Sequence, residues 1–199
     1  MPRPVVTVQP ATPDRWADLE AIFGEKGACA GCWCMFWRLP SGASRHNTPT
    51  DNKQALRALV ATGQAPGLLA YVDGAPAGWC AVGPREAFAR LEASRKLKRL
   101  DDQPVWSIPC FFVARPFRRQ GLMRALIRAA VGYARAHGAR LIEGYPVDLE
   151  SAPLRGHKLT GDGGFTGIAS AFRAEGFVEA AQASETQRIL RRKVRPARS

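Results

Sequence analysis

Apolar residues recur along this chain with two spacings, and these spacings predict strands and helices in alternation. Asp73-Gly74, between two apolar runs, predicts a tight hairpin turn. Apolar runs bounded by glycine and proline predict strands at residues 4–10, twice within 67–85, and at 105–113, 139–147 and 177–194, the last as one strand or two. Helical spacing predicts helices at 12–23, 52–62, 121–137 and 167–176.

The order of these elements indicates an α/β or α+β fold with a mixed sheet. The strand at 105–113, the next helix and the strand at 139–147 form a βαβ unit, so these two strands are expected to be parallel. Three segments are expected to be connections: a loop rich in glycine and aromatic residues at 25–50, a charged surface connection at 88–102, and a polar insertion at 148–166.

Composition narrows the class of protein. The chain has 199 residues and is 46% hydrophobic, which suits one domain over residues 1–199 with a real core. No apolar run approaches the roughly 18 residues of a membrane span, and the N-terminus lacks the pattern of a signal peptide. We therefore expect a soluble cytoplasmic protein with no membrane partner.

The net charge of +12 favours a phosphate-bearing partner, such as a nucleotide cofactor, a nucleic acid or an acidic substrate. Part of this charge is local, because residues 188–199 hold six basic residues and no acidic one. This segment is expected to be a basic C-terminal strand or tail. Solvated basic faces and tails are also common without any such partner.

A basic turn precedes the helix that begins at Gly121. Arg118 and Arg119 lie beside a helix N-terminus, where backbone N–H groups lack partners and a glycine lets a ligand approach closely. This combination binds phosphate. Neither the GxGxxG fingerprint nor the GxxxxGK[ST] loop is present, so the turn predicts a pyrophosphate site at residues 118–124 of another kind.

The stretch VARPFRRQGLM, from Val113 to Met123, resembles the VxxxxRxxGxG/A signature of the GNAT superfamily of acetyl-CoA-dependent N-acetyltransferases. Downstream, FRAEGF from Phe172 to Phe177 is similar to the family's YxxxGF ending. The resemblance covers nearly the whole chain and implies a single bacterial-type domain. It implies a largely antiparallel sheet with a parallel split at the cofactor site, and helices on both faces.

The resemblance also implies the cosubstrate acetyl-CoA, with its pyrophosphate on the turn and its pantetheine arm along the preceding strand. Met123 stands where the signature has a small residue, and Phe172 stands where the family usually has the tyrosine that protonates the leaving thiolate. The implied cofactor residues are Phe111, Phe112, Val113, Arg118, Arg119, Gln120, Gly121, Leu122, Met123, Arg124, Ser170 and Phe172.

Transfer of an acetyl group to an amine needs a neutral amine and a donor to the developing oxyanion, and an acid for the thiolate assists it. Strand alternation places Glu143 and Tyr145 on one face of the strand that follows the phosphate-binding helix. Glu143 is the candidate general base and Tyr145 the candidate replacement acid. The alternative is a surface carboxylate paired with an arginine and a half-buried strand tyrosine.

The loop at 25–50 contains CAGCWCMFWR. The resemblance places this loop beside the acceptor pocket, where Trp33, Phe36 and Trp37 would form an aromatic wall; simple core packing is the alternative. Cys29, Cys32 and Cys34 have a spacing that suits zinc or a redox pair, but no fourth ligand is specified, although His46 and Cys80 are candidates. No metal is expected, and His46 and His157 are expected to be surface residues.

The function that follows is transfer of an acetyl group from acetyl-CoA to an amine of a small molecule or a peptide. Two alternatives stay open: an acetyltransferase directed to tRNA or another nucleic acid, which the charge motivates, and a non-catalytic acyl-CoA-binding module, which Phe172 motivates. Nucleic acid and a second copy of the chain are retained as alternative partners.

Overall fold

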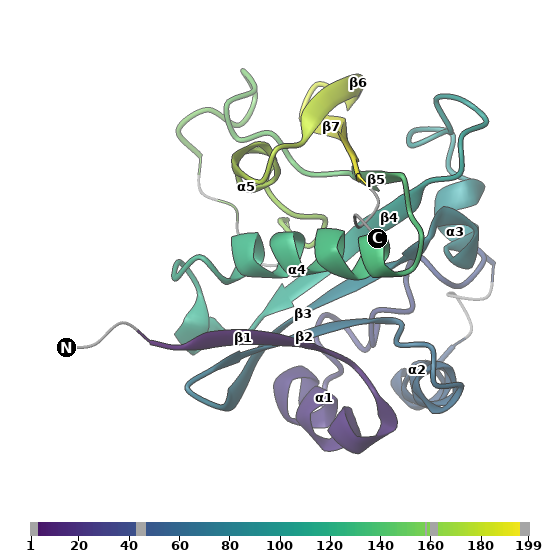
Figure 1. Cartoon of the computed structure of the whole chain (residues 1–199), viewed down its shortest axis with the longest axis vertical. Helices are drawn as coiled ribbons and strands as arrows, with labels where there is room; N and C mark the ends of the chain where they lie inside the picture. Colours follow the sequence, from purple (N-terminus) through teal and green to yellow (C-terminus); the bar gives the residue numbers. More distant parts are fainter. Residues whose placement is uncertain (1–3, 43–46, 158, 160–162, 196–199) are drawn as a thin grey trace.

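One seven-stranded sheet organises the chain in the computed structural model, which describes residues 4–42, 47–157, 159 and 163–195 (Figure 1). Its strand order is β1-β2-β3-β4-β5-β7-β6. The strands are β1 (Val6–Pro10), β2 (Gly67–Val72), β3 (Ala75–Pro84), β4 (Trp106–Val113), β5 (Leu141–Gly144), β6 (Val178–Ser184) and β7 (Gln187–Lys193). The α-helices are α1 (Trp16–Phe23), α2 (Pro49–Ala61), α3 (Ala89–Glu92), α4 (Leu122–Ala136) and α5 (Ala169–Ala174).

All neighbouring strands are antiparallel except β4 and β5, which confirms the predicted mixed sheet and its parallel pair. These two strands pair only from Trp106 opposite Ile142 to Ile108 opposite Gly144. Pro109 comes next in β4 and has no N–H group with which to continue the ladder. Beyond this point β4 and β5 separate, and the sheet is split along the C-terminal half of β4.

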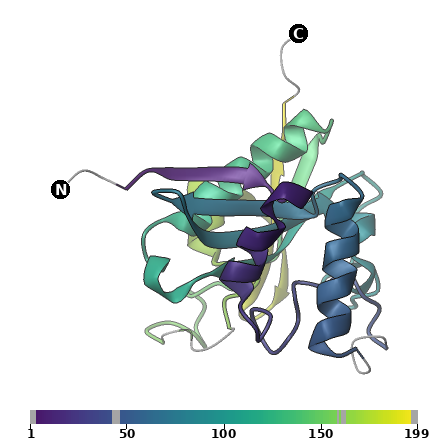
Figure 2. The same ribbon diagram turned by 90° about the horizontal axis from the view of Figure 1, so that it is seen from below.

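Helices cover both faces of the sheet, as expected (Figures 1 and 2). One core lies between the sheet and helices α1 and α2, and includes Leu19, Leu56 and Trp79. The other lies between the sheet and helices α4 and α5, and includes Leu126 and Phe172. Alternate residues of β2 and β3 enter opposite cores, because successive side chains of a strand point to opposite faces.

The boundaries of α4 agree with the sequence prediction. Gly121 is its N-cap with φ 81°, and Gly138 follows its C-terminus with φ 81°, both in the left-handed region that glycine adopts without strain. Helix α2 begins three residues earlier than expected. Thr48 and Asp51 form a capping box there, in which each side chain accepts a hydrogen bond from the other's backbone N–H.

The segment at 88–102 connects β3 to β4 and is mostly exposed or half-buried, as expected, but three apolar residues anchor it. Phe88 and Leu91 are fully buried and Leu97 is almost fully buried, all in the core that includes α1. Only four residues of the segment, Ala89–Glu92, form a helix. The preceding Arg85 is also buried and holds this segment through its guanidinium, which donates to the carbonyls of Leu91 and Leu97.

No helix in the described part of the chain is both long enough and apolar enough to span a bilayer.

Candidate functional site

The turn that leads into α4 presents a row of backbone donors. None of the N–H groups of residues 119–124 donates to a backbone carbonyl within the described chain, whereas the N–H of Ala125 already bonds the carbonyl of Gly121. These groups lie at the N-terminus of a 15-residue helix, where the macrodipole is positive. The turn is therefore built to accept an anion with several oxygens.

Two arginines of the turn are exposed and have no carboxylate partner among the described residues. The Nε atom of Arg118 donates to the carbonyl of Val113 at 2.9 Å, which fixes its stem while its charge faces solvent. Arg119 has φ 63°, a conformation that L-residues other than asparagine, aspartate and histidine rarely adopt. By contrast, Arg124 and Arg128 bind the buried carboxylate of Glu175.

A cavity of about 480 Å³ lies beside this turn. Most of the residues expected to bind the cofactor line it. Gln120 does not, because its side chain donates back to the carbonyl of Pro116. Phe172 does not either, since its ring is fully buried between Phe111 and Phe177. The expected residues that do line the cavity are Phe111, Phe112, Val113, Arg118, Arg119, Gly121, Leu122, Met123, Arg124 and Ser170.

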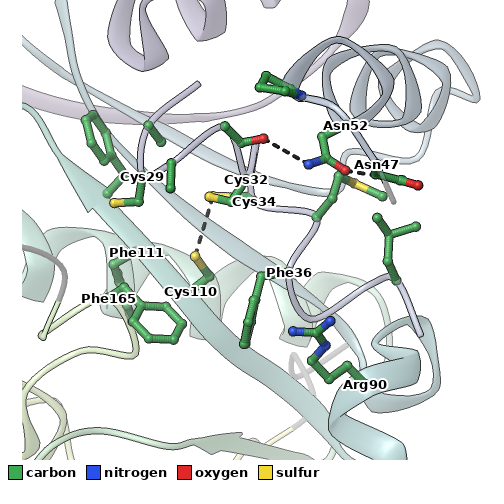
Figure 3. A pocket seen from close by; sticks show the side chains of 17 residues that line it. Cys29, Cys32, Cys34, Phe36, Asn47, Asn52, Arg90, Cys110, Phe111 and Phe165 are labelled. Carbon is green, nitrogen blue, oxygen red and sulfur yellow. Dashed lines mark hydrogen bonds between the residues drawn. The ribbon is translucent and has the colours of Figure 1, made fainter. Parts of the chain in front are cut away.

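A second cavity, of about 400 Å³, opens on the other side of β4 and is lined largely by the loop at 25–50 (Figure 3). Apolar side chains and thiols dominate its walls. Four residues line both cavities: Cys29, Phe111, Phe112 and Phe165. The two cavities thus meet at one wall, which is the arrangement that transfer of a group between two bound molecules requires.

The aromatic residues of the loop divide between cavity and core. Phe36 lines the second cavity and is 37% exposed. Trp33 and Trp37 do not line it and pack in the core instead, Trp33 against Trp16 and Trp37 against Phe165. Both Trp33 and the next residue have positive φ, so this loop does not follow strand alternation.

Four cysteines line the second cavity and none forms a disulfide. The sulfur atoms of Cys34 and Cys110 lie 3.5 Å apart, and this contact, together with burial, raises the pKa of Cys34 well above its usual value. Among the described residues, no three cysteine, histidine or acidic side chains are grouped to hold a metal ion. His46, the candidate fourth ligand, lies outside the described residues, and His157 is exposed as expected.

Glu143 and Tyr145 share one face of the strand, as expected, but that face is filled by a buried polar network. Arg85 donates from one nitrogen to both the Glu143 carboxylate and the Tyr145 hydroxyl, at 2.9 Å each. The other oxygen of Glu143 accepts from Arg191 at 2.6 Å, and Tyr145 also contacts Ser107 at 2.8 Å. Neither residue lines either cavity.

Burial, and then the charge of Glu143, raise the pKa of Tyr145 well above its usual value. The network therefore keeps Tyr145 protonated and holds Glu143 between two guanidinium groups. The pairing of Glu143 with arginine agrees with the alternative, but its expected surface position and the expected half-burial of Tyr145 are wrong, because both side chains are fully buried.

Several lining residues were not expected in the site, among them Phe165, Asn52 and Arg90. Glycines surround Phe165 in the sequence GGFTG, and they are the one local signal that another group approaches closely there. The N–H of Phe111 donates to the carbonyl of Phe165 at 2.6 Å, inside the split of the sheet. Asn52 and Arg90 belong to polar stretches in which nothing distinguishes a cavity residue from a solvated one.

Comparisons with known proteins agree with this architecture. Solved structures with similar folds include a GNAT family acetyltransferase from Streptococcus pneumoniae, with TM-score 0.52, 14% identity, and coverage of 96% of this chain and 99% of that one. They also include an N-acetyltransferase from Staphylococcus aureus Mu50, with TM-score 0.53, 12% identity, and coverage of 96% and 99%. A third is the putative acetyltransferase YncA from Salmonella typhimurium with its cofactor acetyl-CoA, with TM-score 0.52, 13% identity, and coverage of 98% and 96%.

The search of curated proteins gives no match. The family model described as "Acetyltransferase (GNAT) family" matches residues 32–151, which is more than half of the chain and contains β4, the turn at 118–124 and most of the second cavity. With the split sheet and the donor-lined turn, this match shows that the chain belongs to the GNAT family of acetyltransferases.

Proposed function

We propose that this protein transfers an acetyl group from acetyl-CoA to an amine, with acetyl-CoA in the cavity beside the turn and the amine in the cavity beside the loop at 25–50. The observation that carries the proposal is the wall that the two cavities share, formed by Cys29, Phe111, Phe112 and Phe165. A thioester that reaches this wall from one side meets an amine that reaches it from the other.

The pyrophosphate of acetyl-CoA suits the turn, because N–H groups at a helix N-terminus and two exposed arginines complement its charge. The pantetheine arm suits the C-terminal half of β4, where the sheet is split. Along this strand the backbone of Phe111 and Val113 faces the split, since Phe111 donates to Phe165 and the carbonyl of Val113 accepts from Arg118. The similar YncA structure, which holds acetyl-CoA, supports this choice of cosubstrate.

A donor for the oxyanion is present at the shared wall. The N–H of Phe111 is taken by the carbonyl of Phe165 in this structure, at 2.6 Å. A thioester oxygen bound there would replace that carbonyl and receive the same hydrogen bond as negative charge develops on it. Gly164 and Gly167 flank Phe165 closely, and Gly167 has φ 92°, so the backbone here has the freedom to yield.

The proton balance of the reaction does not require a side-chain base. Among the described residues that line the two cavities there is no carboxylate and no imidazole. The amine therefore attacks in its neutral form: the N–C bond forms, the C–S bond breaks, coenzyme A leaves as the thiolate, and the extra proton on nitrogen passes to water or to that thiolate. We assign Glu143 and Tyr145 to supporting the strand rather than to proton transfer.

The test is to incubate the protein with acetyl-CoA and a panel of primary amines, and to quantify both coenzyme A and the acetylated product by mass spectrometry. Calorimetry with acetyl-CoA gives the binding affinity separately. Arg119→Asn is the test variant, and Arg140→Asn, at an exposed arginine four residues after the end of α4, is its matched control. Only the first is expected to weaken binding. No binding at millimolar acetyl-CoA would disprove the proposal.

A second candidate is a protein that binds acetyl-CoA without turning it over. The absence of a carboxylate and of an imidazole among the described lining residues favours it, as does the phenyl ring of Phe172 in the core. Tight binding of acetyl-CoA without acetylation of any amine would support this candidate. A nucleic-acid substrate is less favoured, because the arginines of β7 are used internally: Arg188 binds Asp148 and Arg191 binds Glu143.

A further inference from the structure

The charge distribution of the second cavity indicates what kind of amine it takes. Arg90 is the one charged side chain among the described residues that line it. The remaining polar side chains are the amides of Asn47 and Asn52 and the thiols; Asn47 donates to the Asn52 oxygen, and Asn52 donates to the carbonyl of Gly31. The cavity is therefore apolar along most of its wall and positive at one place.

Arg90 is held firmly at this place. Its backbone N–H donates to the carbonyl of Trp37 at 3.0 Å, which ties α3 to the loop at 25–50. Its guanidinium lies over the ring of Phe36, 4.1 Å from the ring centre. Burial lowers the pKa of Arg90 from its usual value. A partly desolvated guanidinium fixed against an aromatic ring binds a carboxylate in a defined geometry.

The position of Arg90 sets the distance between the two functional groups of the acceptor. In Figure 3 Arg90 lies at the opposite side of the cavity from Cys29 and Phe111, which belong to the wall shared with the first cavity. An amine at this wall and an acid at Arg90 must therefore be separated by a spacer. Phe36, whose ring centre lies 5.7 Å from that of the wall residue Phe165, lines the space between the wall and Arg90.

We propose that the acceptor is a primary amine that carries a carboxylate on the far side of an apolar, preferably aromatic, spacer, and that Arg90 binds this carboxylate. An α-amino acid does not fit this description, because its amine and carboxylate share one carbon atom. This inference rests on the proposed acetyl transfer, and Arg90 is its specificity-determining residue rather than a catalytic one.

The test compares para-(aminomethyl)benzoate with benzylamine and with the methyl ester of the acid, which differ only at the group that Arg90 would meet. For the wild-type protein we expect kcat/KM for the acid to exceed that for either neutral amine by about tenfold or more, as one charge-assisted hydrogen bond provides. In Arg90→Met this preference is expected to disappear, and in Arg90→Lys to persist in part. Arg95→Met, at an exposed arginine three residues beyond α3, is the matched control and should keep the full preference.

A binding measurement separates this inference from the proposed function. Para-methylbenzoate has the acid but no amine, so its affinity for the protein, measured by calorimetry, does not depend on turnover. We expect Arg90→Met to weaken it by about tenfold or more while the affinity for acetyl-CoA stays unchanged. If benzylamine is acetylated as well as the acid, or if the preference survives in Arg90→Met, the inference is wrong and acetyl transfer stands. If no amine is acetylated but para-methylbenzoate binds through Arg90, the proposed function fails instead.

Discussion

Substitution of Glu143 by Gln tests whether this carboxylate is catalytic or structural. The side chain is 1% exposed, and its two oxygens accept hydrogen bonds from Arg85 and Arg191. Gln has nearly the same shape but removes the charge, and its NH₂ group must face one of the two guanidinium groups. The substitution therefore leaves the buried charge of Arg85 with only part of its compensation.

The size of the effect follows from what each arginine retains. Removing one partner of a buried ion pair typically costs about 3–5 kcal/mol of unfolding free energy. Arg85 keeps the carboxylate of Glu92 and two carbonyl acceptors, and Arg191 keeps Asp101. We therefore expect Glu143→Gln to lower the free energy of unfolding by about 2–4 kcal/mol, with kcat of the folded enzyme changed by less than about threefold.

The assay is urea unfolding of the wild type and the variant, with kcat measured at a temperature where both are folded. Glu86→Gln is the control. Glu86 pairs with Arg99 at the exposed edge of the same network, and an ion pair of this kind contributes less than about 1 kcal/mol to the free energy of unfolding. A variant of near wild-type stability whose kcat falls by about a hundredfold or more would show that Glu143 is a general base after all, and the structural assignment would be refuted.

Three further predictions concern the turn at 118–124, the split of the sheet and the ion pairs of Glu175. Arg119→Asn, which keeps the left-handed backbone but removes the charge, should weaken acetyl-CoA binding about tenfold in calorimetry and reduce its salt dependence. Gly144→Ala should destabilise the fold by about 2–3 kcal/mol in urea unfolding, because its Cβ would lie 2.2 Å from the Phe172 ring. Glu175→Gln should lose stability at neutral pH but approach the wild type as pH falls, since the ion pair with Arg128 lowers the pKa of Glu175.

The glycine prediction has a matched control variant, and the Glu175 prediction has a defined direction of pH dependence. Gly132→Ala, where an added Cβ meets nothing within 4 Å on an exposed helix face, should be neutral or stabilising, so equal losses at both glycines would contradict the packing argument. For Glu175, the depressed folded pKa means that stability is present above the unfolded value of about 4.3 and is lost as pH falls through the folded pKa. A gap between wild type and variant that is constant from about pH 7 down to about pH 3 would contradict it.

The elements of the fold could be predicted from the sequence because local signals and tertiary packing agree. The hairpin at Asp73-Gly74, the parallel pair around α4 and the glycines at both ends of α4 all have short-range signatures. The turn at 118–124 could also be predicted from local sequence, since its hydrogen-bond donors are the backbone N–H groups of a single helix N-terminus. The start of α2 also has a local signal, because TPTD at residues 48–51 has the pattern of a capping box. The predicted start at residue 52 was too late because it was based on the apolar spacing, which begins after the cap.

The surroundings of Glu143 and Tyr145 and of the loop at 25–50 could not be predicted in the same way, because they come from distant segments. The face that Glu143 shares with Tyr145 followed from alternation, but Arg85, which fills that face, comes from a segment 58 residues earlier in the chain. The loop at 25–50 has several residues with positive φ, so nothing local tells that Phe36 faces the cavity and Trp33 the core. The segment at 88–102 contains several basic residues, and nothing in the sequence distinguishes Arg90, which lines the cavity, from the others.

The absence of a base among the described lining residues and the positive charge of the site support the same mechanism. An apolar cavity disfavours an ammonium group, and the charges that face the two cavities, Arg90 on one side and Arg118 and Arg119 on the other, are of the same sign as that ammonium. Under the proposed transfer, an amine that enters is expected to give up its proton to solvent first, so that no side chain has to remove it later. The same field would attract the pyrophosphate of acetyl-CoA and the carboxylate of the inferred acceptor, so the two proposals require only one distribution of charge to bind both molecules and to favour the reactive form of the amine.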